Sequence, residues 1–124
     1  MAAHMRAYRA NDPFSQKPTM ASNRIIVLFN LKPGRDAGDY EAWARSTDLP
    51  TVNALGSIQS FEVFKATGLL GSTEAPPFRY IEIVDVKDME AFGQDIATET
   101  MKKIAAEFQD WAEPMFITTE RIEA

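Results

Sequence analysis

Hydrophobic residues along this chain fall into short runs of β-branched and aromatic side chains, separated by stretches with helical spacing. The segment Arg24 to Lys32 is a continuous apolar run, which is typical of a buried strand. Three further runs are rich in β-branched or aromatic residues or alternate with polar positions. The predicted strands are therefore 24–32, 57–66, 78–86 and 115–122.

Alternation within the third predicted strand places Ile81 and Ile83 on one face and Tyr80, Glu82 and Val84 on the other. Both faces carry apolar side chains. The pattern alone therefore does not say which face lies against the rest of the domain.

The first helical region follows the turn signal Pro33-Gly34 and begins with an acidic N-cap at Asp36. It is predicted to end at about Ser46. Because a proline disfavours helical geometry in the residue before it, Pro50 is expected to exclude Leu49 from a helix. A short turn or helical piece is predicted for 51–55.

The second helical region is predicted to begin at a cap, Asp88, and to stop at Glu113-Pro114. Its apolar residues keep helical spacing except for a step of five residues between Ile96 and Met101. That slip predicts a bend or two successive helices, with the break near Thr98.

The resulting order, β-α-β-β-α-β, is the ferredoxin-like arrangement of an α+β domain. It implies a four-stranded antiparallel sheet with the helices on one face. The other face still carries apolar side chains, so we expect a homodimer that buries it and closes a dimeric α/β barrel.

The first residues differ from this pattern. Segment 1–23 has Asn-Asp-Pro and Lys-Pro breaks and no sustained periodicity, which predicts a flexible N-terminal arm before a single domain at 24–124. Its start, Met1 to Met5, resembles a cloning remnant. The alternative is an arm that packs Tyr8 and Phe14 onto a partner subunit.

Composition narrows the chemistry. The 124 residues carry a net charge of −5 and scattered basic residues, so no nucleic-acid partner is expected. No apolar run approaches a membrane span and no secretory signal is evident, so no membrane association and a cytoplasmic location are expected. Cysteine is absent and His4 is the only histidine, which removes the usual zinc, copper and haem ligands and the common catalytic triads. We therefore expect no cofactor.

The strand and turn at 26–34, the stretch 40–55 with Ser60 to Val63, and the strand 79–86 resemble the RedY-like (HapK-like) family of the dimeric α/β-barrel superfamily. The resemblance implies biosynthesis of prodigiosin-type pyrrole pigments. Several relatives have a histidine on the first strand, but Arg24 and Ile25 occupy that region here. The resemblance therefore implies neither a haem ligand nor a histidine base at this position.

The candidate catalytic residues are Asp48, Glu82 and Tyr80. Tyr80 and Glu82 lie two apart on one strand and share a face, and a carboxyl group in an apolar setting has a raised pKa suited to acid–base work. Two alternatives stay open. Glu82 can face a partner subunit and pair with Arg79, Lys65 or Arg121, and Asp48 can simply cap the turn at Pro50.

The candidate substrate-binding residues are Trp43, Arg45, Phe29 and Phe108. For Trp43 and Phe108 the spacing favours a place in the core over a binding role, and Arg45 can serve the helix dipole alone. The leading hypothesis is a cofactor-free condensation or cyclisation of a small aromatic, pyrrole- or indole-like molecule. The alternatives are a non-catalytic binding dimer for a hydrophobic intermediate and a cofactor-free monooxygenase.

Overall fold

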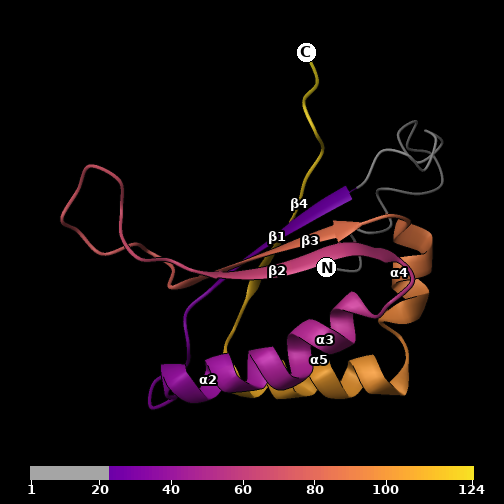
Figure 1. The fold of residues 1–124 in the computed structure, drawn as a ribbon, viewed down its shortest axis with the longest axis horizontal. Coiled ribbons are helices and arrows are strands. Elements are labelled where there is room, and N and C mark those ends of the chain that lie inside the picture. Colours follow the sequence, from indigo (N-terminus) through magenta and orange to yellow (C-terminus); the bar gives the residue numbers. More distant parts are fainter. Residues whose placement is uncertain (1–22) are drawn as a thin grey trace.

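A computed structural model describes residues 23–124, in which a four-stranded sheet carries all of the helices on one face (Figure 1). The predicted N-terminal arm lies outside the described residues. The elements in chain order are β1 (Asn23–Phe29), α2 (Ala37–Trp43), η2 (Ala44–Asp48), α3 (Leu49–Asn53), β2 (Ile58–Lys65), β3 (Tyr80–Val86), α4 (Met89–Asp95), α5 (Glu99–Trp111) and β4 (Met115–Thr118).

The strands are ordered β2-β3-β1-β4 and every neighbouring pair is antiparallel. This is the ferredoxin-like arrangement, so the predicted α+β fold is confirmed. The register between the two central strands sets Val27 opposite Glu82 and Phe29 opposite Tyr80. Opposed residues share a face of the sheet, and Val27 and Phe29 are buried.

The first helical region is longer than predicted. It does not end near Ser46 but continues through the π-helical turn η2 into α3, which contains Leu49 and Pro50. Pro50 lies in the first turn of α3, where a missing N–H costs little. In η2 the Leu49 N–H bonds to the Ala44 carbonyl, five residues back. We attribute this wide turn to Pro50, whose ring would clash with the carbonyl four residues earlier in a regular α-helix.

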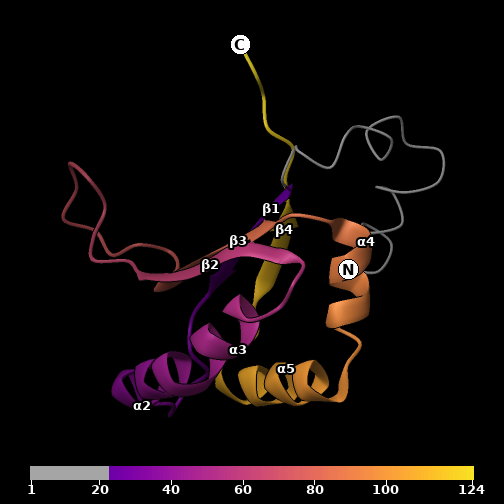
Figure 2. The same cartoon turned by 45° about the vertical axis from the view of Figure 1, so that its right-hand side comes forward.

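The second helical region is broken where the spacing slipped. Helix α4 is capped by Asp88, whose carboxylate accepts the N–H groups of Glu90 and Ala91. Helix α5 begins after Thr98, whose hydroxyl accepts the Met101 N–H at 3.3 Å. The predicted break near Thr98 is therefore confirmed. Figure 2 shows α4 turned away from α5 at one end of the sheet.

Two strands are shorter than predicted. β1 ends at Phe29, and beyond it only an isolated bridge joins Leu31 to Ala112. β4 ends at Thr118, not at Ile122. The pairing of β4 with β1 ends at Thr118, opposite Ile25. At the next residue the Thr119 hydroxyl donates to the Arg24 carbonyl, so a side chain rather than the backbone uses this acceptor.

The core lies between the sheet and the helices. Its largest fully buried side chains are Val27, Phe29, Tyr40, Tyr80 and Val86. The opposite face of the sheet has no helix over it among residues 23–124 (Figure 2). By register, that outer face carries the apolar residues Ile26, Leu28, Phe64, Ile81, Ile83, Met115 and Ile117.

Candidate functional site

Three polar side chains are buried between the sheet and the helical segment 37–53. They are Tyr40 from α2, Asp48 from η2 and Glu82 from β3, with exposed fractions of 0%, 4% and 3%. Glu82 lies on the helix-facing side of β3, together with Tyr80 and Val84. We call Tyr40, Asp48 and Glu82 the buried acidic cluster. The structure thus brings the two predicted catalytic carboxyl groups into one region.

The wide turn explains why Asp48 points inward. Tyr40, Ala44, Asp48 and Val52 are buried and follow one another every four residues. In a regular α-helix such a series drifts by about 40° at each step. The π-helical turn has more residues per turn, so it reduces this drift and keeps Asp48 in line with Tyr40.

No cation or donor satisfies the cluster within the described part of the chain. The Tyr40 hydroxyl and the Glu82 Oε2 atom are buried without a hydrogen-bond partner. Asp48 occupies the N-cap position of α3 but makes no capping hydrogen bond. Glu82 faces the helices and forms none of the ion pairs found in residues 23–124. The structure therefore corrects the alternatives of a partner-facing, ion-paired Glu82 and a capping Asp48.

Burial without compensation changes the protonation of this cluster. Desolvation raises the pKa of Asp48 to about 7. Desolvation, followed by the charge of Asp48, holds the pKa of Glu82 well above its usual range. The Tyr40 hydroxyl also has a raised pKa, first because it is buried and then because of the charges of Glu82 and Asp48. Both carboxyl groups therefore hold their protons to higher pH than surface carboxyl groups do.

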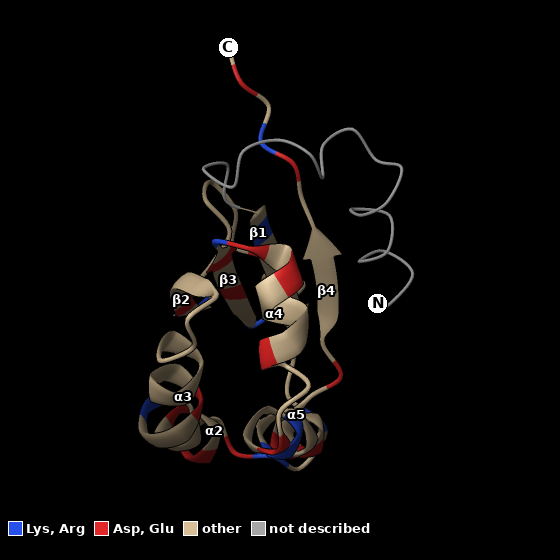
Figure 3. Cartoon of the chain, turned by 90° about the vertical axis from the view of Figure 1, so that its right-hand side faces the viewer, with Lys and Arg blue, Asp and Glu red and all other residues tan. Residues whose placement is uncertain are grey.

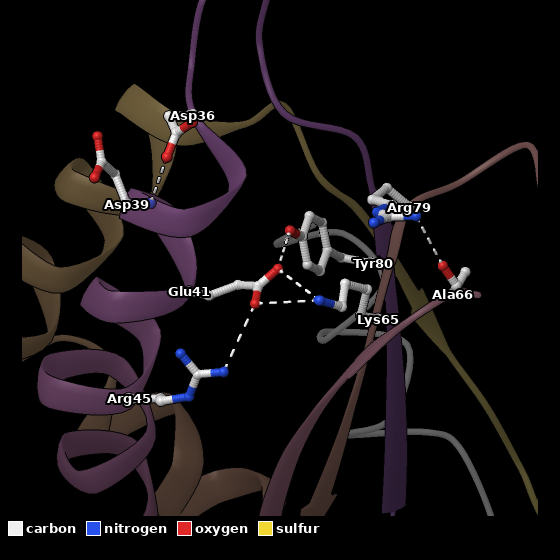
Figure 4. A network of polar contacts seen from close by, with 8 residues as sticks. All are labelled: Asp36, Asp39, Glu41, Arg45, Lys65, Ala66, Arg79 and Tyr80. Carbon is white, nitrogen blue, oxygen red and sulfur yellow. Dashed lines mark hydrogen bonds and ion pairs between the residues drawn. The ribbon is translucent and has the colours of Figure 1, made fainter.

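Tyr80 is held by a separate network at the edge of this region (Figure 4). Its hydroxyl donates to Glu41 Oε2 at 2.8 Å, while Lys65 Nζ and an Arg45 guanidinium nitrogen lie 3.4 and 3.6 Å from the same carboxylate. Burial and this hydrogen bond raise the pKa of Tyr80 to about 12. The hydrogen bond from Tyr80 also lowers the pKa of Glu41. Tyr80 therefore acts as a hydrogen-bond donor rather than an acid.

Glu41 was not predicted from the sequence, although one signal for it exists. Glu41 and Arg45 are four residues apart on a helix, the spacing of a favourable ion pair. The contact with Tyr80 joins residues 39 positions apart. Only the packing of α2 on the sheet reveals it.

The four predicted substrate-binding residues separate into two groups. Phe29 and Phe108 belong to the buried core, with ring centroids 5.0 Å apart, and Trp43 stacks on Phe108 at 6.3 Å. Trp43 is half-buried and donates its Nε1–H to Glu107 at 2.8 Å. The Arg45 side chain is 72% exposed and pairs with Glu41, away from the buried acidic cluster.

Metal-binding groups and membrane-spanning helices are both absent from residues 23–124. No group of three or more His, Cys, Asp or Glu side chains there could hold a metal ion. None of the described helices is both long and apolar enough to cross a membrane. Figure 3 shows Lys and Arg positions spread over separate elements rather than gathered on one of them.

Comparisons with known proteins agree with this fold. The family described as REDY-like protein HapK matches residues 23–122. The crystal structure of HapK from Hahella chejuensis is 27% identical, with a TM-score of 0.67, over 82% of this chain and 94% of that one. Hydroxynitrile lyase from Passiflora edulis is 12% identical, with a TM-score of 0.69, over 85% and 97% of the two chains.

A third solved structure is SnoaB, a cofactor-independent oxygenase from Streptomyces nogalater. It is 10% identical, with a TM-score of 0.66, over 84% of this chain and 96% of that one. No curated protein sequence matches the chain. The order of the elements and of the strands defines a small α+β protein of the ferredoxin-like class. Within that class, the chain belongs to the REDY-like HapK family.

Proposed function

We propose that this chain is a small-molecule protein of secondary metabolism that assists a cofactor-free condensation or cyclisation of a pyrrole- or indole-like intermediate. Membership of the REDY-like HapK family supports the setting. The observation that carries the chemistry is the pair of buried carboxyl groups, Asp48 and Glu82, on elements that face each other.

The two carboxyl groups differ in a way that suits acid–base work. Glu82, whose pKa is raised by burial and by its neighbour's charge, keeps its proton and acts as the acid. Asp48 ionises near neutral pH and acts as the base. In a ring closure Asp48 accepts the proton released from carbon or nitrogen, and Glu82 protonates the carbonyl oxygen that receives the electron pair.

Aromatic side chains around the cluster support an aromatic substrate. Tyr40 lies edge-on to Phe29 and to Tyr80, with centroids 5.6 and 4.9 Å apart, and Trp43 lies 6.1 Å from Tyr40. Such rings favour flat, π-rich ligands. Glu41 holds the Tyr80 ring in place by accepting the hydrogen bond of the Tyr80 hydroxyl.

We also propose that the protein is a cytoplasmic homodimer formed through the outer face of the sheet.

The test is the variant Asp48→Asn, assayed against a panel of pyrrole and indole aldehydes and ketones by loss of the carbonyl chromophore. General acid–base groups contribute roughly 10²–10⁴-fold to rates, so we expect a loss of that size with no fall in melting temperature. Asp110→Asn, at an exposed position of α5, is the matched control and keeps full activity.

Other outcomes assign the other functions. Equal loss of folding and turnover in Asp48→Asn removes the catalytic assignment. Ligand binding without turnover, unchanged by Asp48→Asn and Glu82→Gln, assigns a non-catalytic binding dimer instead. Oxygen consumption with an electron-rich aromatic substrate assigns a cofactor-free monooxygenase.

A further inference from the structure

The buried acidic cluster contains polar atoms that have no hydrogen-bond partner among the described residues. Glu82 Oε2 and the Tyr40 hydroxyl oxygen have no partner in the described residues, and Asp48 makes no hydrogen bond to its own helix cap. Buried polar atoms in proteins nearly always have a partner, because leaving one unpaired costs about 1–3 kcal/mol. A ligand that supplies donors to these oxygens removes that cost.

The charges around the cluster favour a donor that is also a cation. Lys65 and Arg45 are bound to Glu41, outside the cluster, and Arg24 pairs with Asp85. Every titratable group that faces the cluster is therefore acidic or phenolic. These groups are Tyr40 and Glu41 on α2, Asp48 on η2, and Tyr80 and Glu82 on β3.

The remaining neighbours of the cluster are uncharged. The helix-facing side of β1 contributes Val27 and Phe29, and α5 contributes Phe108, whose ring contacts Phe29. Aromatic faces attract cations by about 0.5–2 kcal/mol, most strongly when water is excluded. Two carboxyl groups with aromatic surroundings and no protein cation form a receptor for positive charge.

We propose that the buried acidic cluster selects aromatic ligands that carry a positively charged nitrogen, such as an ammonium, amidinium or protonated imine, over neutral or anionic ligands with the same ring. The aromatic part of the ligand rests on the proposed function, and the positive charge of the ligand is what this inference adds. The cation donates to Glu82 and Asp48, and its charge offsets theirs.

A metal ion is the rival source of positive charge. The described residues hold no group of three His, Cys, Asp or Glu side chains to ligate one. An organic cation needs fewer ligands because each N–H makes one directed hydrogen bond. Asp48 and Glu82 are almost fully buried, so a ligand reaches them only if the side chains that cover them move apart.

Binding of a cation is coupled to proton release. The ligand favours the ionised carboxylates, whereas burial favours their protonated forms by raising the pKa of Asp48 to about 7. The affinity for a ligand of fixed positive charge therefore rises with pH until Asp48 is ionised without it. A neutral ligand gains nothing from this step.

The experiment uses three probes on one ring: 3-aminomethylindole, indole-3-methanol and indole-3-carboxylate. Calorimetry on the full chain at several pH values, in buffers of different ionisation enthalpy, measures affinity and proton release. We expect the ammonium probe to bind at least about tenfold more tightly than the alcohol, and its affinity to rise several-fold from pH 6 to pH 8 with protons released. Glu82→Gln and Asp48→Asn each reduce the preference, and Asp110→Asn leaves it unchanged.

Several results would overturn the inference. They are equal or tighter binding of the alcohol or the carboxylate, no binding of any probe to a folded protein, and displacement of the ammonium probe by Mg²⁺ alone. A protein that binds neutral indoles and loses turnover in Asp48→Asn would keep the proposed function and lose only this inference.

Discussion

The buried position of Asp48 costs the fold stability. A carboxyl group that is 4% exposed and lacks a hydrogen bond gains nothing from ionisation in the folded state, while in the unfolded chain it is solvated. The folded protein therefore binds the Asp48 proton more tightly than the unfolded chain does. Natural proteins accept such costs mainly where function requires them.

This difference predicts how stability depends on pH. Because the pKa of Asp48 rises from 3.8 to about 7 on folding, its stabilising contribution is complete below about pH 4 and is lost as pH rises to about 7. Each pH unit in that window costs roughly 1.4 kcal/mol for one fully shifted group. Urea unfolding of the wild type at pH 5 and pH 8 should show lower stability at pH 8.

Asp48→Asn should flatten that dependence and leave the variant at least as stable as the wild type at pH 8. Asp110→Asn, whose side chain is exposed, should follow the wild-type curve. An unchanged slope in Asp48→Asn would contradict the burial-driven shift. Glu82 titrates in the same direction because its pKa is also raised by burial, so some slope should remain until Glu82→Gln is added.

The sequence predicted the carboxyl pair better than it predicted the surroundings of that pair. Tyr80 and Glu82 were expected on one face because strand alternation requires it. Which face that was could not be settled, since the residues on the other face, Ile81 and Ile83, are also apolar. Glu41 and the polar role of Tyr40 depend on how α2 packs, which no local pattern contains.

At the scale of elements, propensity rules worked where one cap decides the outcome and failed where two effects compete. Asp36 and Asp88 each accept a backbone N–H at a predicted helix start, and Thr98 accepts one at the predicted break. Pro50 was expected to end a helix, yet it lies in the first turn of α3. A proline predicts where a regular α-helix ends, but it does not predict whether a π-helical turn lets the helix continue past it.

The Thr98 cap should have a measurable value. Its hydroxyl accepts the Met101 N–H and starts the 13-residue helix α5, which carries Ile104 and Phe108 into the core. Thr98→Ala should lower the free energy of unfolding by about 1 kcal/mol in urea denaturation. Thr100→Ala is the matched control inside the same helix, where alanine is the better helix former and no loss is expected. Equal losses in both variants would refute the capping role.

At the scale of the whole molecule, the sheet is covered unequally. The helices bury one face, while the outer face presents apolar side chains from all four strands. Phe64, Met115 and Ile117 are 45%, 51% and 37% exposed. Contiguous apolar surface of this kind usually marks an interface. A second copy of the chain presents the same surface, so a two-fold dimer would bury both at once.

Ile83 tests that dimer because it lies on the outer face of the central strand β3 and points away from the buried acidic cluster. Ile83→Glu should place like charges at the centre of the interface and convert the dimer to monomer in sedimentation equilibrium. Lys103→Glu, at an exposed position on α5, should remain dimeric. A stable interface buries about 1,600 Å² in total, so the melting temperature of the wild type should also rise with protein concentration, whereas that of Ile83→Glu should not. A wild-type chain that sediments as a monomer would show that the outer face serves another purpose, and unchanged dimerisation of Ile83→Glu would place the interface elsewhere.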